Sequence, residues 1–275
     1  MVASNDTMRQ CPIENMSLSY HERGSGPPVL LVHGFPFTSQ IWNRTGDLLV
    51  SRGLWEIAPD LRGFGQSPLP DDRTITTVKQ FADDLCLLLE KMGVTEKVFI
   101  VGLSMGGYVA IQFAQKYAER LSGIVLCGTK TAADAPPIAE TRRKQAAALL
   151  EGSLSMADIA DMMIPKLFST ATQMRKPELI AELRNIIESQ QHIQGIAAAM
   201  LGMAERPDTT EVLQQLEIPV LAVCGAEDQF SPPVEMRRLA ETAKQGTYIE
   251  IPDAGHLLPM EQPELFADVF DKLRR

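Results

Sequence analysis

The 275-residue sequence lacks several features that would define a class at once. No apolar run approaches the ~20 residues that a membrane-spanning helix requires, so we expect no membrane partner. Basic residues are also fewer than acidic ones. The chain has 26 Lys and Arg against 35 Asp and Glu, for a net charge of −9. Because nucleic-acid binding needs a basic face, we expect no nucleic-acid partner either.

Cysteine and histidine are both scarce, with four of each. Cys86, Cys127 and Cys224 lie in apolar segments, and no cysteines form a CxxC pair. With an N-terminal stretch that lacks the apolar run of a secretion signal, this pattern predicts reduced, mostly buried thiols in a cytoplasmic protein. A Cys127–Cys224 disulfide is the alternative. The histidines show no metal-ligand spacing, so we expect no metal.

Short apolar runs of strand type alternate with helix-type patterns through most of the chain. Strands are predicted within 18–22, 29–32, 55–58, 98–101, 124–126, 220–223 and 248–251. Helices are predicted over about 39–51, 77–92 and 105–117, and from about 234 and 263, while the Gly- and Pro-rich residues 60–75 predict a loop. This alternation predicts an α/β fold with a mainly parallel sheet and helices on both faces.

Residues 131–205 break the alternation. They contain no convincing strand, and helices are predicted near 140–151, 155–168, 177–190 and 193–204. We therefore expect one α/β core formed by 1–130 and 206–275, with 131–205 inserted as a helical cap segment. The cap segment holds six of the thirteen methionines. We expect its methionines and leucines to face inward as an adaptable apolar roof.

The first candidate catalytic residue is Ser104, in the frame Gly102-Leu103-Ser104-Met105-Gly106. It lies between the most β-branched predicted strand and a helix. A turn this sharp would strain the serine backbone and lift its Oγ clear of the sheet. Glycines are needed on both sides because β-carbons there would collide. The pattern predicts a nucleophile.

A serine nucleophile needs a base, and a base needs an orienting carboxylate. His256 follows the last predicted strand, so it can reach the same sheet edge as Ser104. Asp228 follows the strand ending near Cys224 and is the preferred acid, with Glu227 as its rival. The chain order Ser104, Asp228, His256 distinguishes this arrangement from those of other serine hydrolases.

A developing oxyanion needs two hydrogen-bond donors. The Met105 N–H follows from the turn at Ser104. The second donor should come from the loop His33-Gly34-Phe35-Pro36, where Phe35 still has an N–H and Pro36 does not. We therefore predict the backbone N–H groups of Phe35 and Met105 as an oxyanion hole.

Five motifs occur in this chain in the same order and spacing as in a known superfamily. They are His33-Gly34-Phe35-Pro36, residues 60–67 (DLRGFGQS), residues 102–107 (GLSMGG), residues 225–228 (GAED) and Gly255-His256. The chain resembles the α/β-hydrolase superfamily over about 16–130 and 207–275, and it is most similar to small esterases, enol-lactonase-like hydrolases and cofactor-free haloperoxidase-like proteins. The resemblance implies an eight-stranded sheet and no cofactor.

Departures from other branches narrow the chemistry. Epoxide hydrolases and haloalkane dehalogenases use an Asp nucleophile where this chain has Ser104. Epoxide hydrolases also use cap tyrosines, and residues 131–205 contain no Tyr or Trp. We expect a serine hydrolase of a small, largely apolar carboxylic ester or lactone, acting through an acyl-enzyme. The pocket residues predicted with it are Phe168, Met200, Met203, Phe230 and Leu257.

Three alternatives stay open. One is hydrolysis of carbon–carbon bonds in β-diketones, and another is haloperoxidase-like peracid formation. The third belongs to a different class, a ligand receptor or signalling protein that turns over slowly. A carboxylate-bearing lactone would need a cationic clamp, for which Arg142, Arg143 and Arg206 are candidates. The sequence leaves the oligomeric state open.

Overall fold

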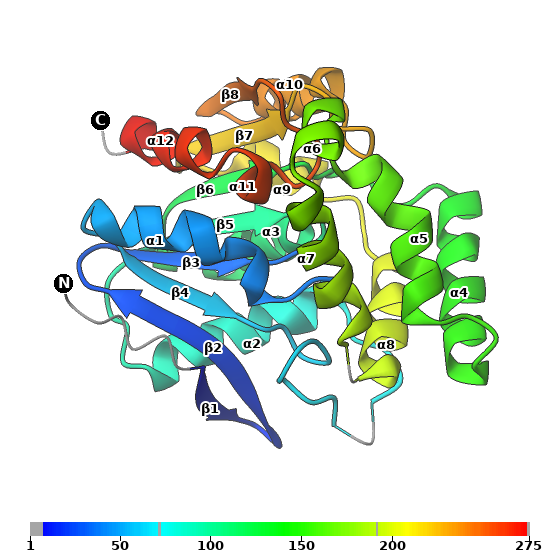
Figure 1. The fold of residues 1–275 in the computed structure, drawn as a ribbon. Coiled ribbons are helices and arrows are strands. Elements are labelled where there is room, and N and C mark those ends of the chain that lie inside the picture. The colour runs from blue at the N-terminus through cyan, green and yellow to red at the C-terminus, as the bar shows by residue number, and fades with distance from the viewer. Residues whose placement is uncertain (1–7, 71–72, 191, 274–275) are drawn as a thin grey trace.

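The computed structural model describes residues 8–70, 73–190 and 192–273; the remaining positions, which include two residues of the predicted loop 60–75, lie outside the described part. One eight-stranded sheet has the order β1-β2-β4-β3-β5-β6-β7-β8 (Figure 1). The strands are β1 (Arg9–Ile13), β2 (Met16–Gly24), β3 (Pro28–Val32), β4 (Trp55–Pro59), β5 (Val98–Leu103), β6 (Leu121–Cys127), β7 (Val220–Gly225) and β8 (Gly246–Ile251). All pairs from β4 to β8 are parallel, and β2 pairs antiparallel with β1 and β4.

Strand β1 is the one strand that the residue pattern did not predict. Its sequence contains Pro12, which cannot donate a hydrogen bond to a neighbouring strand. Proline is tolerated here because β1 is an edge strand that pairs only with β2. With β1, the sheet reaches the eight strands that the family resemblance implies.

Helices cover both faces of the sheet. On one face α1 (Asn43–Ser51) packs against α12 (Pro263–Leu273), and on the other α2 (Val78–Lys91) packs against α3 (Met105–Tyr117) (Figure 1). Helix α10 (Pro233–Thr242) packs on β7 and β8. Every residue of β3 is buried, as expected of a strand covered on both sides. The predicted mostly parallel α/β fold is confirmed.

In its described residues, the cap segment contains five helices and no strand. They are α4 (Pro136–Glu151), α5 (Met156–Leu167), α6 (Thr170–Arg175), α7 (Pro177–Glu188) and α8 (Ile193–Ala204). They gather at the side toward which the parallel strands point (Figure 1). The short α6 was not predicted, nor were α9 (Thr210–Gln215), α11 (Leu258–Glu261) and the 3₁₀ helix η2 (Ala118–Arg120). The helix predicted over about 39–51 is present as the 3₁₀ helix η1 (Ser39–Trp42) followed by α1.

The inward orientation expected of the cap methionines is wrong for two of them. Met156, Met200 and Met203 are buried, but Met162 is 46% and Met174 78% exposed. Met162 and Met174 lie on α5 and α6, whose outer faces meet water. Methionine is therefore not a reliable marker of the inner face of this cap.

All four cysteines are buried and free, so the Cys127–Cys224 disulfide does not form. Burial raises the pKa of the Cys224 thiol to about 11, with the hydrogen bond from Tyr248 opposing the shift. Among the described residues, no helix is both long enough and apolar enough to cross a membrane.

Candidate active site

Ser104 occupies the sharp turn between β5 and α3. Its backbone is strained, with φ 54° and ψ −112°, a conformation that a residue with a side chain rarely adopts. The glycines explain how the turn closes. A Cβ on Gly102 would lie 2.2 Å from the Gly106 carbonyl oxygen, and one on Gly106 would lie 2.2 Å from that of Val32. The predicted strain and the predicted collisions are both present.

Asp228 and His256 come together from the ends of neighbouring strands. Asp228 follows β7 and His256 follows β8. His256 Nδ1 lies 2.8 Å from Asp228 Oδ2, and both side chains are buried. The other oxygen, Asp228 Oδ1, accepts the N–H groups of Phe230 and Ser231 at 2.8 and 2.9 Å. The carboxylate is thus fixed on both sides, and it fixes the imidazole ring.

Glu227, the rival acid, has a different partner. Its Oε2 accepts the N–H and the Oγ1–H of Thr170 in the cap segment, at 2.9 and 2.7 Å. These hydrogen bonds lower the pKa of the exposed Glu227 carboxyl. The structure therefore brings Asp228, and not Glu227, to His256.

Residues at the end of β6 contact both the serine turn and the His256–Asp228 pair. Cys127 C=O accepts the Ser104 N–H at 2.8 Å. The next residue is Gly128, and a Cβ there would lie 2.7 Å from Asp228 Oδ2 and 3.0 Å from His256 Nδ1. Sequence reasoning missed this glycine. Its one signal was its position directly after a predicted strand.

The loop after β3 also approaches Ser104. A Cβ on Gly34 would lie 3.2 Å from Ser104 Cβ. His33 holds this loop, because its Nδ1 lies 2.9 Å from Gly34 O while its Nε2 accepts the Leu61 N–H at 2.9 Å. Burial lowers the pKa of His33, against the nearby charge of Asp60. A neutral ring, with the proton on Nδ1, fits both hydrogen bonds.

The two predicted oxyanion donors, Phe35 N–H and Met105 N–H, lie in this loop and at the first residue of α3. Neither N–H donates to another described residue. A helix leaves its first N–H groups without intrahelical acceptors, so Met105 N–H is a natural donor to a ligand. The partial positive charge of the helix N-terminus favours an anion there.

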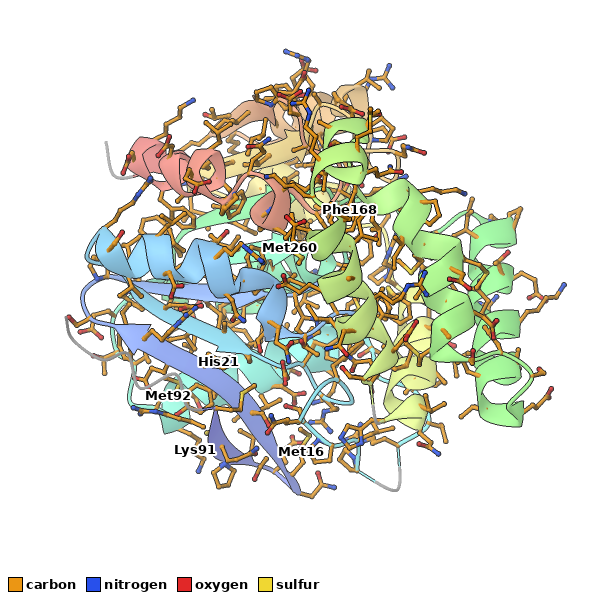
Figure 2. The ribbon with its side chains drawn as sticks, viewed as in Figure 1. Met16, His21, Lys91, Met92, Phe168 and Met260 are labelled. Carbon is orange, nitrogen blue, oxygen red and sulfur yellow. The ribbon has the colours of Figure 1, made fainter. Side chains whose placement is uncertain are left out.

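The predicted pocket residues are divided between core and cap. Phe230 is partly exposed, and its ring centroid lies 5.1 Å from that of His256. Leu257 is buried next to His256. Met200 and Met203 are buried on α8, and Phe168 is buried at the end of α5, where the cap meets α11 and its Met260 (Figure 2).

The three arginines considered as a carboxylate clamp already have partners. Asp134 Oδ2 binds Arg142 Nε at 2.6 Å, and Asp134 Oδ1 binds Arg206 Nη2 at 2.9 Å. Arg143 pairs with Glu140 at 3.8 Å. Over the described ranges, no group of three or more His, Cys, Asp or Glu residues could hold a metal ion.

Comparisons with known proteins agree with this fold. The model of the alpha/beta hydrolase family matches residues 29–269. A thermophilic esterase from Thermogutta terrifontis, solved with malate bound, is 41% identical, with a TM-score of 0.91 and 98% of each chain covered. The 3-oxoadipate enol-lactonase 2 of Acinetobacter baylyi is 28% identical, covering 76% of this chain and 74% of its own.

A third relative, from Bacillus subtilis, carries the provisional name 2-succinyl-6-hydroxy-2,4-cyclohexadiene-1-carboxylate synthase. It is 29% identical, and the match covers 88% of each chain. Because the family model spans most of the sequence, this chain belongs to the alpha/beta hydrolase family. The identification made from the five motifs is confirmed.

Proposed function

We propose that this enzyme hydrolyses a small, largely apolar carboxylic ester or lactone through Ser104, His256 and Asp228. One observation carries the proposal above the others. A serine with a strained backbone lies at the carboxyl edge of the sheet where a buried His256–Asp228 hydrogen bond of 2.8 Å also lies. This combination supplies a nucleophile, a base and an orienting acid.

The reaction follows from these groups. Ser104 Oγ attacks the carbonyl carbon while His256 Nε2 accepts the hydroxyl proton, and the Phe35 and Met105 N–H groups hold the oxyanion. His256 then returns the proton to the leaving alkoxide, which departs and leaves an acyl group on Ser104. A water molecule, deprotonated by His256, attacks the acyl carbon, and His256 returns the proton to Ser104 Oγ as the carboxylic acid is released. Asp228 keeps the proton on Nδ1 and stabilises the imidazolium.

The relatives indicate the enzyme class, a carboxylic ester hydrolase. The esterase from Thermogutta terrifontis shares 41% of its residues with this chain over nearly the full length. Lactones stay within the proposal because an enol-lactonase is also a relative. Substrates that bear an extra carboxylate are less well supported, because Asp134 engages Arg142 and Arg206.

Residues 131–205, as the proposed cap, would select the substrate. Its buried Met200, Met203 and Phe168 are apolar, and each buried methylene of an acyl or alcohol group favours binding by about 0.8 kcal/mol. We therefore expect the cap to set acyl preference and the core to perform the chemistry.

Ser104→Ala is the direct test. Hydrolysis of a short aryl ester should fall by about 10⁴-fold or more, while a phosphonylating reagent should add mass to the wild type only. Ser122→Ala, at the amino end of β6, is the matched control and should keep full activity. Retention of most activity by Ser104→Ala would contradict the proposal. A labelled Ser104 with negligible turnover on esters, lactones and β-diketones would instead favour a receptor.

A further inference from the structure

Glu261 is a fully buried carboxylate outside the proposed triad. It ends the short helix α11, and both of its side-chain oxygens accept backbone N–H groups. Oε1 accepts the Gly255 N–H at 2.7 Å, and Oε2 accepts the Ser169 N–H at 2.8 Å. Hydrogen bonds to a buried carboxylate are strong because they replace its lost hydration.

No lysine or arginine in the described part of the chain forms an ion pair with this carboxylate. Lys176 Nζ donates to the main-chain carbonyl of Glu261 instead, at 2.8 Å. Two peptide N–H groups are therefore the hydrogen-bond partners of the buried Glu261 carboxylate. A residue that only filled space in the core would be apolar, since burying a charge is costly.

The two N–H groups belong to functionally different parts of the protein. Gly255 directly precedes His256, in the core. Ser169 directly follows Phe168, in the cap segment. These two stretches also touch, because Leu167 C=O accepts the N–H groups of His256 and Leu257 at 2.8 and 3.2 Å.

Gly255 shows how closely the two backbones approach. A Cβ at this position would lie 2.8 Å from Leu167 O and 2.8 Å from Ser169 N. The cap backbone therefore lies directly on the histidine loop. Figure 2 shows the same junction, with Phe168 beside α11.

We propose that Glu261 is a positioning residue that holds His256 in place by joining the Gly255 N–H of the core to the Ser169 N–H of the cap. The inference rests on the proposed function, because it assigns a task to Glu261 only if His256 is the base. Asp228 fixes the imidazole ring, and Glu261 fixes the main chain from which the ring projects.

Glu261→Gln is the conservative perturbation. Glutamine keeps the length of the side chain but has one acceptor oxygen and one NH₂ donor. One of the two N–H groups then loses its acceptor and faces a donor. Because catalytic geometry tolerates little displacement, a shift of about 1 Å can cost about 10²-fold in rate.

Glu227→Gln is a matched control. Glu227 is also a carboxylate that accepts a cap N–H, that of Thr170, but it comes from the loop of Asp228 and is exposed. A glutamine there keeps an acceptor for Thr170. We expect activity within about 3-fold of wild type, as for most exposed substitutions.

Leaving-group dependence separates a positioning role from a merely structural one. His256 must protonate an alkoxide as it leaves, whereas an aryloxide leaves without help. With an alkyl and an aryl ester of one acid, Glu261→Gln should lower kcat/KM, which reports the acylation step, about 10- to 100-fold for the alkyl ester and distinctly less for the aryl ester. KM should change by less than about 3-fold, since the carboxylate does not contact substrate.

A second pair of variants tests the cap side without changing Glu261. Ser169 has φ −62° and Phe168 lies in the extended region, so the backbone at 169 is compatible with proline. The proline ring would replace the N–H that Glu261 Oε2 accepts and would push this oxygen away, so Ser169→Pro breaks the link on the cap side. Ser169→Ala removes the hydroxyl alone, with its hydrogen bonds to the Asp253 carbonyl and to Thr172. Ser169→Pro should shift the alkyl-to-aryl ratio as Glu261→Gln does, and Ser169→Ala should shift it distinctly less, because the Ser169 N–H keeps its hydrogen bond to Glu261.

Equal losses on both esters in Glu261→Gln, or identical ratios in Ser169→Pro and Ser169→Ala, would overturn the inference. If Glu261→Gln does not fold, the Ser169 pair still decides. Failure of the proposed function would look different. In that case the Ser104→Ala variant would hydrolyse the esters as fast as the wild type does. All rates should be taken well below the midpoint of thermal unfolding of each variant, so that unfolded protein does not contribute.

Discussion

Asp228→Asn changes the proton arrangement of the proposed site and little else. Asp228 Oδ1 accepts the Phe230 and Ser231 N–H groups, and an amide oxygen can keep both hydrogen bonds. The amide NH₂ would then occupy the position of Oδ2, which lies 2.8 Å from His256 Nδ1. Two donors cannot face each other, so the imidazole would place its proton on Nε2.

The wrong tautomer removes the base. An Nε2 that already carries a proton cannot accept one from Ser104, and the imidazolium would also lose its carboxylate partner. The corresponding loss in serine proteases is about 10⁴-fold in kcat, equivalent to roughly 5.4 kcal/mol of activation free energy. Because the loop hydrogen bonds persist, we expect the unfolding midpoint to change little.

The assay compares kcat for a short aryl ester in the wild type, Asp228→Asn and Glu227→Gln. Glu227 contacts Thr170 and not His256, so its variant should remain near wild-type activity. A crippled Glu227→Gln beside an active Asp228→Asn would show that the acid is misassigned. Circular dichroism of each variant checks that the fold is intact.

Three further predictions concern the cap, the loop after β3 and the serine turn. Met200→Ala and Met203→Ala should shift the preference for acyl length without slowing phosphonylation of Ser104. Phe168→Ala should shift this preference and also slow phosphonylation, because the adjacent Leu167 carbonyl holds the His256 loop. An unchanged preference for acyl length in all three variants would show that these residues do not line the pocket. Burial lowers the pKa of His33, so the unfolded chain binds a proton that the folded chain does not. The free energy of unfolding in urea should therefore fall below about pH 6.5, by at most ~1.4 kcal/mol per pH unit, and His33→Gln should flatten this dependence. Gly106→Ala would place a Cβ 2.2 Å from Val32 O, and it should lower the midpoint of thermal unfolding sharply; a midpoint near that of the wild type would show that the turn can relax.

Local sequence patterns determined the framework of this protein. Short apolar runs, and one alternating pattern at 18–22, predicted seven of the eight strands. The runs are clearest in the central strands, because a strand buried on both faces needs continuous apolar residues. The spacing of glycines around Ser104 predicted the turn, because the collision at Gly102 is with Gly106, close in the chain, although the collision at Gly106 is with the distant Val32. Chain order and position after strands indicated Asp228 and His256, because the ends of parallel strands meet at one sheet edge.

The tertiary structure decided what depends on contacts between distant segments. The choice between the adjacent acids Asp228 and Glu227 rests on where each side chain finds its partner, at His256 or at Thr170. Gly128 and Glu261 carry no motif that reasoning from the pattern could use. Glu261 accepts an N–H from Ser169, 92 positions away, and periodicity along one segment holds no information about such a partner. Local sequence patterns thus determined the elements and the residues that meet at the sheet edge, while contacts between distant segments determined which of these residues touch each other.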